Sequence, residues 1–139
     1  MPKLKLKNIE GFGGLDYVVV QGVPVRSSKL GEVIQISLDD IERKVAKKII
    51  EIGVPVRGAE VRFLRKALGL SLGRLGAALG LSGTAILKWE KEPKKRLSQI
   101  NEAVVRSFFA ETLKLKINGW FSKLVSHSET PEIMYLKAG

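Results

Sequence analysis

The residues best suited to binding chemistry lie within residues 68–90, where two short helical patterns flank Gly80-Leu81-Ser82. A glycine turn followed by a serine that can cap the next helix is typical of a helix-turn-helix. Thr84, Ala85 and Lys88 would lie on the first turns of the second helix, the end that enters the major groove of DNA in this motif. Their hydroxyl, methyl and ammonium groups are of the kinds that contact base edges. The predicted base-facing residues are Gly83, Thr84, Ala85 and Lys88.

Positive charge is concentrated around this motif. Residues 57–96 contain ten basic side chains against three acidic ones, which gives this segment seven of the ten net positive charges of the chain. A local basic field is the electrostatic footprint of nucleic-acid binding, and a solvated, lysine-rich surface is the alternative. The candidate contacts to the DNA backbone are the two capping serines and the cations of the segment: Ser71, Arg74, Ser82, Lys91, Lys94, Lys95 and Arg96.

The elements that precede the motif are predicted from hydrophobic periodicity. Runs rich in β-branched residues predict strands at residues 17–21, 23–26 and 33–36. A helix follows, with Ser37 placed to cap its start and Gly53 to end it. Apolar residues at steps of three and four predict its inward face as Leu38, Ile41, Val45, Ile49 and Ile52.

The remaining elements are mostly helical. The same periodicity predicts helices at residues 59–68, 71–79, 83–91 and 98–115. After a turn signal at Asn118-Gly119, we expect a short amphipathic helix at residues 120–125 and a short strand at residues 133–136.

Residues 68–90 resemble the helix-turn-helix of Xre/Cro-type repressors. The resemblance implies that Arg65 and Glu90 form a structural ion pair, which locks the first helix of the motif region against the recognition helix. Residues 57–71, together with Trp89-Glu90-Lys91, also look like the helix-turn-helix half of MqsA-type antitoxins of the YgiT family. The similarity covers roughly residues 15–115. It implies a homodimeric, antitoxin-like autorepressor whose N-terminal half binds a partner.

The chain departs from this family in two ways. The family's zinc-binding cysteine pairs are missing because the chain has no cysteine, so we expect no metal and no other cofactor. Leu72 stands where the family has a glutamine that anchors a DNA phosphate, and each interior glycine such as Gly73 and Gly76 weakens its helix by roughly 1 kcal/mol. These departures leave an alternative open: a helix-turn-helix kept as a protein-interaction module without DNA binding.

Other classes of function find little support in the sequence. His127 lies near Ser126, Ser128 and Glu129, but sequence neighbours rarely form a catalytic site, so we expect no enzyme. The glycines at residues 11–14 neither follow a clear strand nor open a helix, which argues against a nucleotide-binding loop. No apolar run is long enough to span a bilayer and the N-terminus does not resemble a secretory signal, so a cytoplasmic protein is expected.

Together these observations predict a mainly α fold, an Xre/Cro-like helix-turn-helix bundle with a small N-terminal α+β subdomain. The expected parts are a strand-rich subdomain with one helix at residues 1–54, a DNA-binding domain at residues 55–117, and a C-terminal tail with a dimer contact at residues 118–139. The expected function is transcriptional regulation by a homodimer that binds duplex DNA, with residues 1–54 as the candidate surface for a protein partner.

Overall fold

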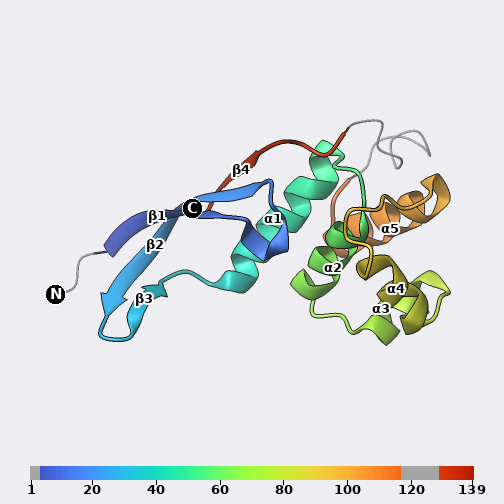
Figure 1. Ribbon diagram of the computed structural model, residues 1–139, viewed down its shortest axis with the longest axis horizontal. Coiled ribbons are helices and arrows are strands. Elements are labelled where there is room, and N and C mark those ends of the chain that lie inside the picture. Colours follow the sequence, from blue (N-terminus) through green and yellow to red (C-terminus); the bar gives the residue numbers. More distant parts are fainter. Residues whose placement is uncertain (1–3, 117–128) are drawn as a thin grey trace. The chain divides into compact units, whose positions relative to one another are not determined.

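A computed structural model describes residues 4–116 and 129–139 (Figure 1). Within these residues the chain forms five α-helices and one mixed sheet of four strands. The fold is therefore α+β, and the predicted mainly α, Xre/Cro-like bundle is wrong. The prediction defined no strand at residues 4–10 and assigned residues 118–139 to a separate tail, whereas residues 4–10 and 134–137 both form strands of the sheet.

The chain divides into two compact units. One consists of residues 1–45 and 131–139, the other of residues 46–130, and the boundary lies inside a helix, α1 (Leu38–Ile52). The predicted boundaries were near residues 54 and 117. The expected strand at residues 133–136 is present as β4 (Met134–Lys137), and it completes the sheet of the N-terminal unit.

The sheet is organised around one long strand, β2 (Val18–Ser28), which Figure 1 shows in the middle of the sheet. Antiparallel neighbours of β2 are β1 (Leu4–Glu10) and β3 (Gly31–Ile34), and β4 runs parallel to it. The glycine segment before β2 forms a single 3₁₀ turn, η1 (Phe12–Gly14). Gly22 has a φ of +69° and allows an irregularity in β2, which changes the register with β1 between Lys7 and Ile9.

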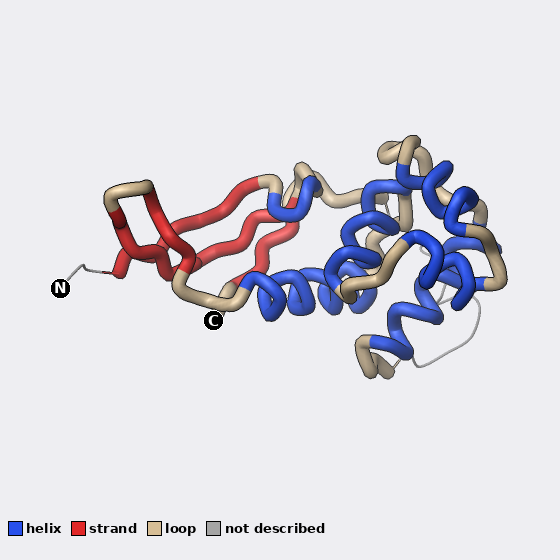
Figure 2. Tube along the Cα trace, turned by 90° about the horizontal axis from the view of Figure 1, so that it is seen from below, coloured by secondary structure: helices blue, strands red, loops and turns tan. Residues whose placement is uncertain are grey.

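The core of the N-terminal unit lies on one face of β2. Val18, Val20 and Val23 are fully buried there, and Val25 is nearly so. The first part of α1 supplies further buried apolar side chains, and Figure 2 shows this helix beginning next to the sheet. Ser37 caps α1 as expected, because its Oγ accepts a hydrogen bond from the backbone N–H of Asp40 at 3.4 Å.

The predicted inward face of α1 is only partly buried. Ile41, Val45 and Ile49 are fully buried, whereas Leu38 and Ile52 at the two ends of the helix are each 46% exposed. Gly53 follows with a φ of +74°, and its backbone N–H donates to the carbonyl oxygen of Ile50. The left-handed residue ends the helix, as the sequence predicted.

The second unit continues from α1 into four helices: α2 (Gly58–Ala67), α3 (Leu72–Leu79), α4 (Gly83–Glu90) and α5 (Gln99–Thr112). Their bounds agree with the predicted helices to within one residue, except that α5 ends three residues earlier. Leu64, Leu75, Ile86, Val105 and Phe109 are fully buried and form its core.

The amphipathic helix predicted at residues 120–125 lies outside the described residues. None of the helices in the described part of the chain is long and apolar enough to cross a membrane.

Candidate nucleic-acid interface

The junction between α3 and α4 is a tight helix-turn-helix. Ser71 Oγ caps α3 by accepting from the N–H of Arg74 at 3.1 Å, and Gly80 ends the helix with a φ of +73°. A Cβ atom at Gly76 would lie 2.7 Å from the Ser82 carbonyl carbon and 2.8 Å from the Leu81 carbonyl oxygen. Only glycine fits there, because the start of α4 passes directly over the backbone of α3. The structure thus confirms the glycine turn predicted at Gly80, and it places the close approach of the two helices at Gly76.

Ser82 fixes the N-terminus of α4. Its Oγ accepts from the N–H of Ala85 at 3.1 Å, and Ile86 on the inner side of the helix is fully buried. The opposite side, which we call the α4 outer face, is exposed and consists of Thr84, Leu87, Lys88 and Lys91. Helical spacing brings these four residues together, since they lie three or four positions apart.

Leu87 was not among the predicted site residues. It is 36% exposed and lies one turn after Thr84 on the same side of α4. Helical periodicity could have found it, since it lies three residues after Thr84. Its methyl groups give this face an exposed apolar surface beside Lys88.

Two of the predicted base-facing residues lie away from the α4 outer face. A Cβ atom at Gly83 would be 3.1 Å from the backbone nitrogen of Gly73 and 3.2 Å from the carbonyl carbon of Leu72. Gly83 therefore faces the start of α3, and its missing side chain allows the two helices to approach each other. Ala85 is partly buried. Of the predicted set, Thr84 and Lys88 are the exposed ones.

The ion pair expected between Arg65 and Glu90 is present. Arg65 Nε and Nη2 donate to the two carboxylate oxygens of Glu90 at 2.8 and 2.9 Å, and Arg65 Nη1 donates to the carbonyl oxygen of Leu70 at 3.0 Å. Both side chains are largely buried, and the hydrogen bond to Glu90 raises the pKa of Arg65 above its ordinary value. The pair ties the end of α4 to α2, so Arg65 is a structural residue.

The chain after α4 carries the predicted phosphate contacts, and we call residues 91–98 the basic loop. Its backbone is tied to the start of α2: Gly58 N–H donates to the Lys95 carbonyl oxygen at 3.2 Å, and Ala59 N–H donates to the Pro93 carbonyl oxygen at 3.0 Å. A Cβ atom at Gly58 would collide with the Trp89 carbonyl oxygen, so glycine is required for this contact. The loop carbonyls satisfy N–H groups that the first turn of α2 leaves unpaired. The basic loop is thus held by main-chain hydrogen bonds.

Arg96 was predicted to contact the DNA backbone, but it has a protein partner. Its Nε and Nη2 donate to the carboxylate of Glu102 at 2.9 and 3.2 Å. The Glu102 side chain is fully buried at the start of α5, while Arg96 is 41% exposed. The guanidinium therefore compensates a buried carboxylate, which corrects its assignment as a phosphate contact.

Arg106 is a second cation placed near this carboxylate. It is 3% exposed, and its Nη1 and Nη2 donate to the carbonyl oxygens of Val54 and Ile50 at 3.3 and 3.0 Å. Burial lowers the pKa of Arg106, and the negative charge of Glu102 opposes this effect. Arg106 thus anchors α5 to the end of α1.

Ion pairs within the protein neutralise some of the basic side chains of residues 57–96. Arg57 donates to the buried carboxylate of Glu60 at 2.7 Å, and Lys95 lies 3.5 Å from Glu92 in an exposed pair. With Arg65 and Arg96 also paired, six basic side chains of residues 57–96 are exposed and have no ion pair with any described residue: Arg62, Lys66, Arg74, Lys88, Lys91 and Lys94. Of these, the last four had been predicted to contact DNA.

Ser71 and Ser82, which were predicted to contact the DNA backbone, cap the helices α3 and α4. Ser71 Oγ and Ser82 Oγ both accept backbone hydrogen bonds, and both residues are exposed. Each hydroxyl can still donate its proton outward, for example to a phosphate oxygen.

No cluster of three or more potential metal ligands occurs among the described residues, and His127 lies outside them. Comparison with family models, with curated proteins and with solved structures finds no match to this chain.

Proposed function

We propose that this protein binds duplex DNA through the α4 outer face and regulates transcription by occupying its site. The observation that carries the proposal is the exposed, cationic side of α4, with Thr84 and Lys88 on a helix whose N-terminus is fixed by Ser82. In this arrangement α4 enters the major groove. Lys88 donates to guanine O6 or N7, and Thr84 hydrogen-bonds a base edge.

The DNA backbone is held by cations that flank these two residues. Arg74 lies on the first turn of α3, and Lys91 and Lys94 belong to the basic loop. All three are exposed and have no ion pair with the described residues, so they are available to phosphates. Because the basic loop is tied to α2 through its main chain, Lys94 is presented from an ordered backbone rather than from a freely moving segment.

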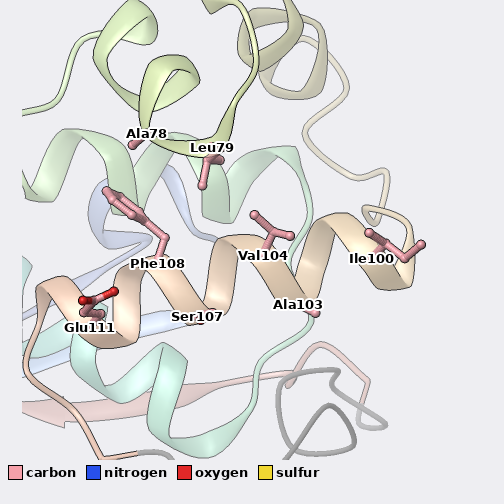
Figure 3. A pocket seen from close by; sticks show the side chains of 8 residues that line it. All are labelled: Ala78, Leu79, Ile100, Ala103, Val104, Ser107, Phe108 and Glu111. Atoms are coloured by element: carbon pink, nitrogen blue, oxygen red, sulfur yellow. The ribbon is translucent and has the colours of Figure 1, made fainter.

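The protein binds as a homodimer in this proposal, and α5 supplies the surface. Ile100, Val104 and Phe108 lie four residues apart and line a groove of about 470 Å³ with Ala78 and Leu79 of α3, as Figure 3 shows. Ile100 is 70% exposed and Val104 is 43% exposed.

Ile100, Val104 and Phe108 on α5 are spaced so that they could pack against the same residues of a second copy of the chain. An antiparallel α5 from a two-fold partner would place Val104 against its own copy, and Ile100 against Phe108 of the partner subunit. Such self-complementarity is the requirement of a two-fold dimer. The resemblance to antitoxins extends the proposal to an autorepressor that also binds a protein partner.

The test is binding to a labelled random-sequence duplex at several salt concentrations. Three cations on phosphates in each protomer (Arg74, Lys91 and Lys94) give six in the homodimer, which predicts a slope of about −5.4 for the logarithm of affinity against the logarithm of salt concentration. Affinity should then fall roughly 1,800-fold between about 50 and 200 mM salt. No binding at about 50 mM salt would contradict the proposal and favour a protein-interaction module.

A further inference from the structure

The face of the sheet opposite its core is apolar and exposed. Residues that pair directly across antiparallel strands have their side chains on the same face. Leu4 pairs with Arg26, and Arg26 pairs with Val33, so these three form one row across β1, β2 and β3. Leu6 extends the row along β1. We call Leu4, Leu6, Arg26 and Val33 the open sheet face; its apolar members are 58%, 75% and 50% exposed in that order.

The apolar and charged side chains of β1 are on the opposite faces from those expected. An edge strand with one solvated face normally has its apolar residues toward the core and its charged residues toward solvent. Lys5 and Lys7 pair with the buried Val25 and Val23, so the lysines are on the core side and the leucines are on the solvent side. Lys7 Nζ forms an ion pair with Glu32 at 3.1 Å. A shift by one residue would turn the leucines inward. The register instead exposes them, and this indicates that another surface covers them.

Arg26 determines the chemistry of that other surface. It lies between Leu4 and Val33, so a partner that covers both leaves Arg26 away from water. Arg26 is exposed and has no ion pair with the described residues. A guanidinium that loses water without gaining a counter-charge is strongly unfavourable. The partner must therefore place a carboxylate at this point, with apolar side chains on either side of it.

We propose that the open sheet face binds another protein, through an apolar surface that contains an Asp or Glu opposite Arg26. A second copy of this face would not satisfy Arg26, because it would bring two guanidinium groups together. Duplex DNA offers phosphates but no extended apolar surface for the leucines. This proposal concerns the N-terminal unit and does not depend on DNA binding by α4.

The test is a selection of binders to the full-length protein from a random peptide library displayed on messenger RNA. Selected peptides should carry a recurrent Asp or Glu among apolar residues. Leu6→Ser should weaken their binding by at least about tenfold, as expected for the loss of one buried leucine. The matched control is Leu30→Ser, since Leu30 is fully exposed in the β2–β3 turn and is not part of the face.

A charge reversal makes the test specific for Arg26. A second selection on the Arg26→Glu variant should yield peptides with Lys or Arg at the position where the first yielded an acid. Circular dichroism spectra of all variants should match that of the parent, since the substituted side chains are exposed. Peptides that bind the parent, Leu6→Ser and Arg26→Glu proteins equally, or a selection without enrichment, would overturn the proposal.

Two further measurements distinguish a protein partner from the other surfaces that could cover the open sheet face. Sedimentation with anionic phospholipid vesicles that requires Leu6 would show a membrane surface in place of a protein. A change of molecular mass on Leu6→Ser substitution would show a second copy. Either result would overturn the proposal. Salt-dependent binding to DNA should be the same for Leu6→Ser and the parent, so failure here is distinguishable from failure of the DNA proposal.

Discussion

Lys94 and Arg96 lie two residues apart in the basic loop, yet the structure gives them different roles. Lys94 is exposed without an ion pair to the described residues, whereas Arg96 donates two hydrogen bonds to the buried carboxylate of Glu102. We therefore expect Lys94→Gln to weaken DNA binding and Arg96→Gln to weaken folding. The two substitutions remove the same charge, so each is the control for the other.

The magnitudes follow from the contacts. Without Lys94, four of the six phosphate-binding cations of the homodimer remain, and the salt slope should change from about −5.4 to about −3.6. The loss of affinity between about 50 and 200 mM salt then drops from roughly 1,800-fold to roughly 150-fold. Arg96→Gln should leave the slope near −5.4. Breaking a fully buried ion pair costs about 3–5 kcal/mol, and the 41% exposure of Arg96 reduces the expected loss of folding stability to about 1–3 kcal/mol.

Two assays separate these outcomes. Fluorescence anisotropy of a labelled random duplex gives the salt slope, and urea unfolding followed by circular dichroism gives the free energy of unfolding. A contradictory result would be an Arg96→Gln variant that changes the slope as much as Lys94→Gln does and leaves the free energy of unfolding unchanged. That result would mean that Arg96 contacts phosphate and that its pairing with Glu102 contributes nothing to the fold.

Three further predictions concern the rest of the chain. In urea unfolding, Gly76→Ala should destabilise the protein by about 1–3 kcal/mol, because its Cβ would overlap the start of α4. The control Gly73→Ala, whose Cβ meets nothing within 4 Å, should stabilise the protein by about 0.5–1 kcal/mol. Equal effects of the two substitutions would contradict the close approach of the helices. Val104→Glu should convert a dimer into a monomer in sedimentation equilibrium, because two carboxylates would meet at the proposed two-fold axis; an unchanged mass would exclude this surface. Partial burial raises the pKa of Glu42, and the nearby charge of Asp39 raises it further. The folded state therefore binds this proton more tightly than the unfolded state does. The protein loses stability as the pH rises through the pKa of Glu42 in the folded state. Glu42→Gln should therefore stabilise the protein at pH 7, with the gain lost at pH values below the unfolded pKa; an equal gain at acidic pH would show another cause.

Much of the helical unit could be predicted from the sequence because its signals are local. Ser71, Ser82 and Gly80 mark helix ends within a few residues of the contacts that they make. At Gly76 glycine is required, because the start of α4 lies against its backbone. The ion pair between Arg65 and Glu90 was implied by the resemblance to a known motif. Nothing in the spacing of the two residues predicted it.

The sheet was harder to predict because its pairing is not local. β4 pairs with β2 across more than a hundred residues of chain, and no local pattern shows which strand accepts it. The alternation of leucine and lysine in β1 has the period of a strand, but its leucines are on the exposed face and its lysines on the side of the core. Hydrophobic periodicity therefore predicts the wrong side of this strand as the side that faces the core.

Errors in the predicted site have the same physical origin. Gly83 was placed on the outer face from its position after Ser82, but its orientation is set by the backbone of α3 at Gly73. Arg96 was taken as a free cation because its partner, Glu102, belongs to the next helix and is buried only in the folded chain. Charge counted along the sequence thus overestimates the charge that is available to DNA.

We propose α4 as the helix that binds DNA. Titrating the ¹⁵N-labelled full-length protein with a short duplex, and following backbone amide chemical shifts, tests it residue by residue. We expect the largest changes between residues 82 and 96, and we expect Lys88→Ala to reduce them. Changes confined to residues outside α3, α4 and the basic loop, or no changes at about 50 mM salt, would contradict it.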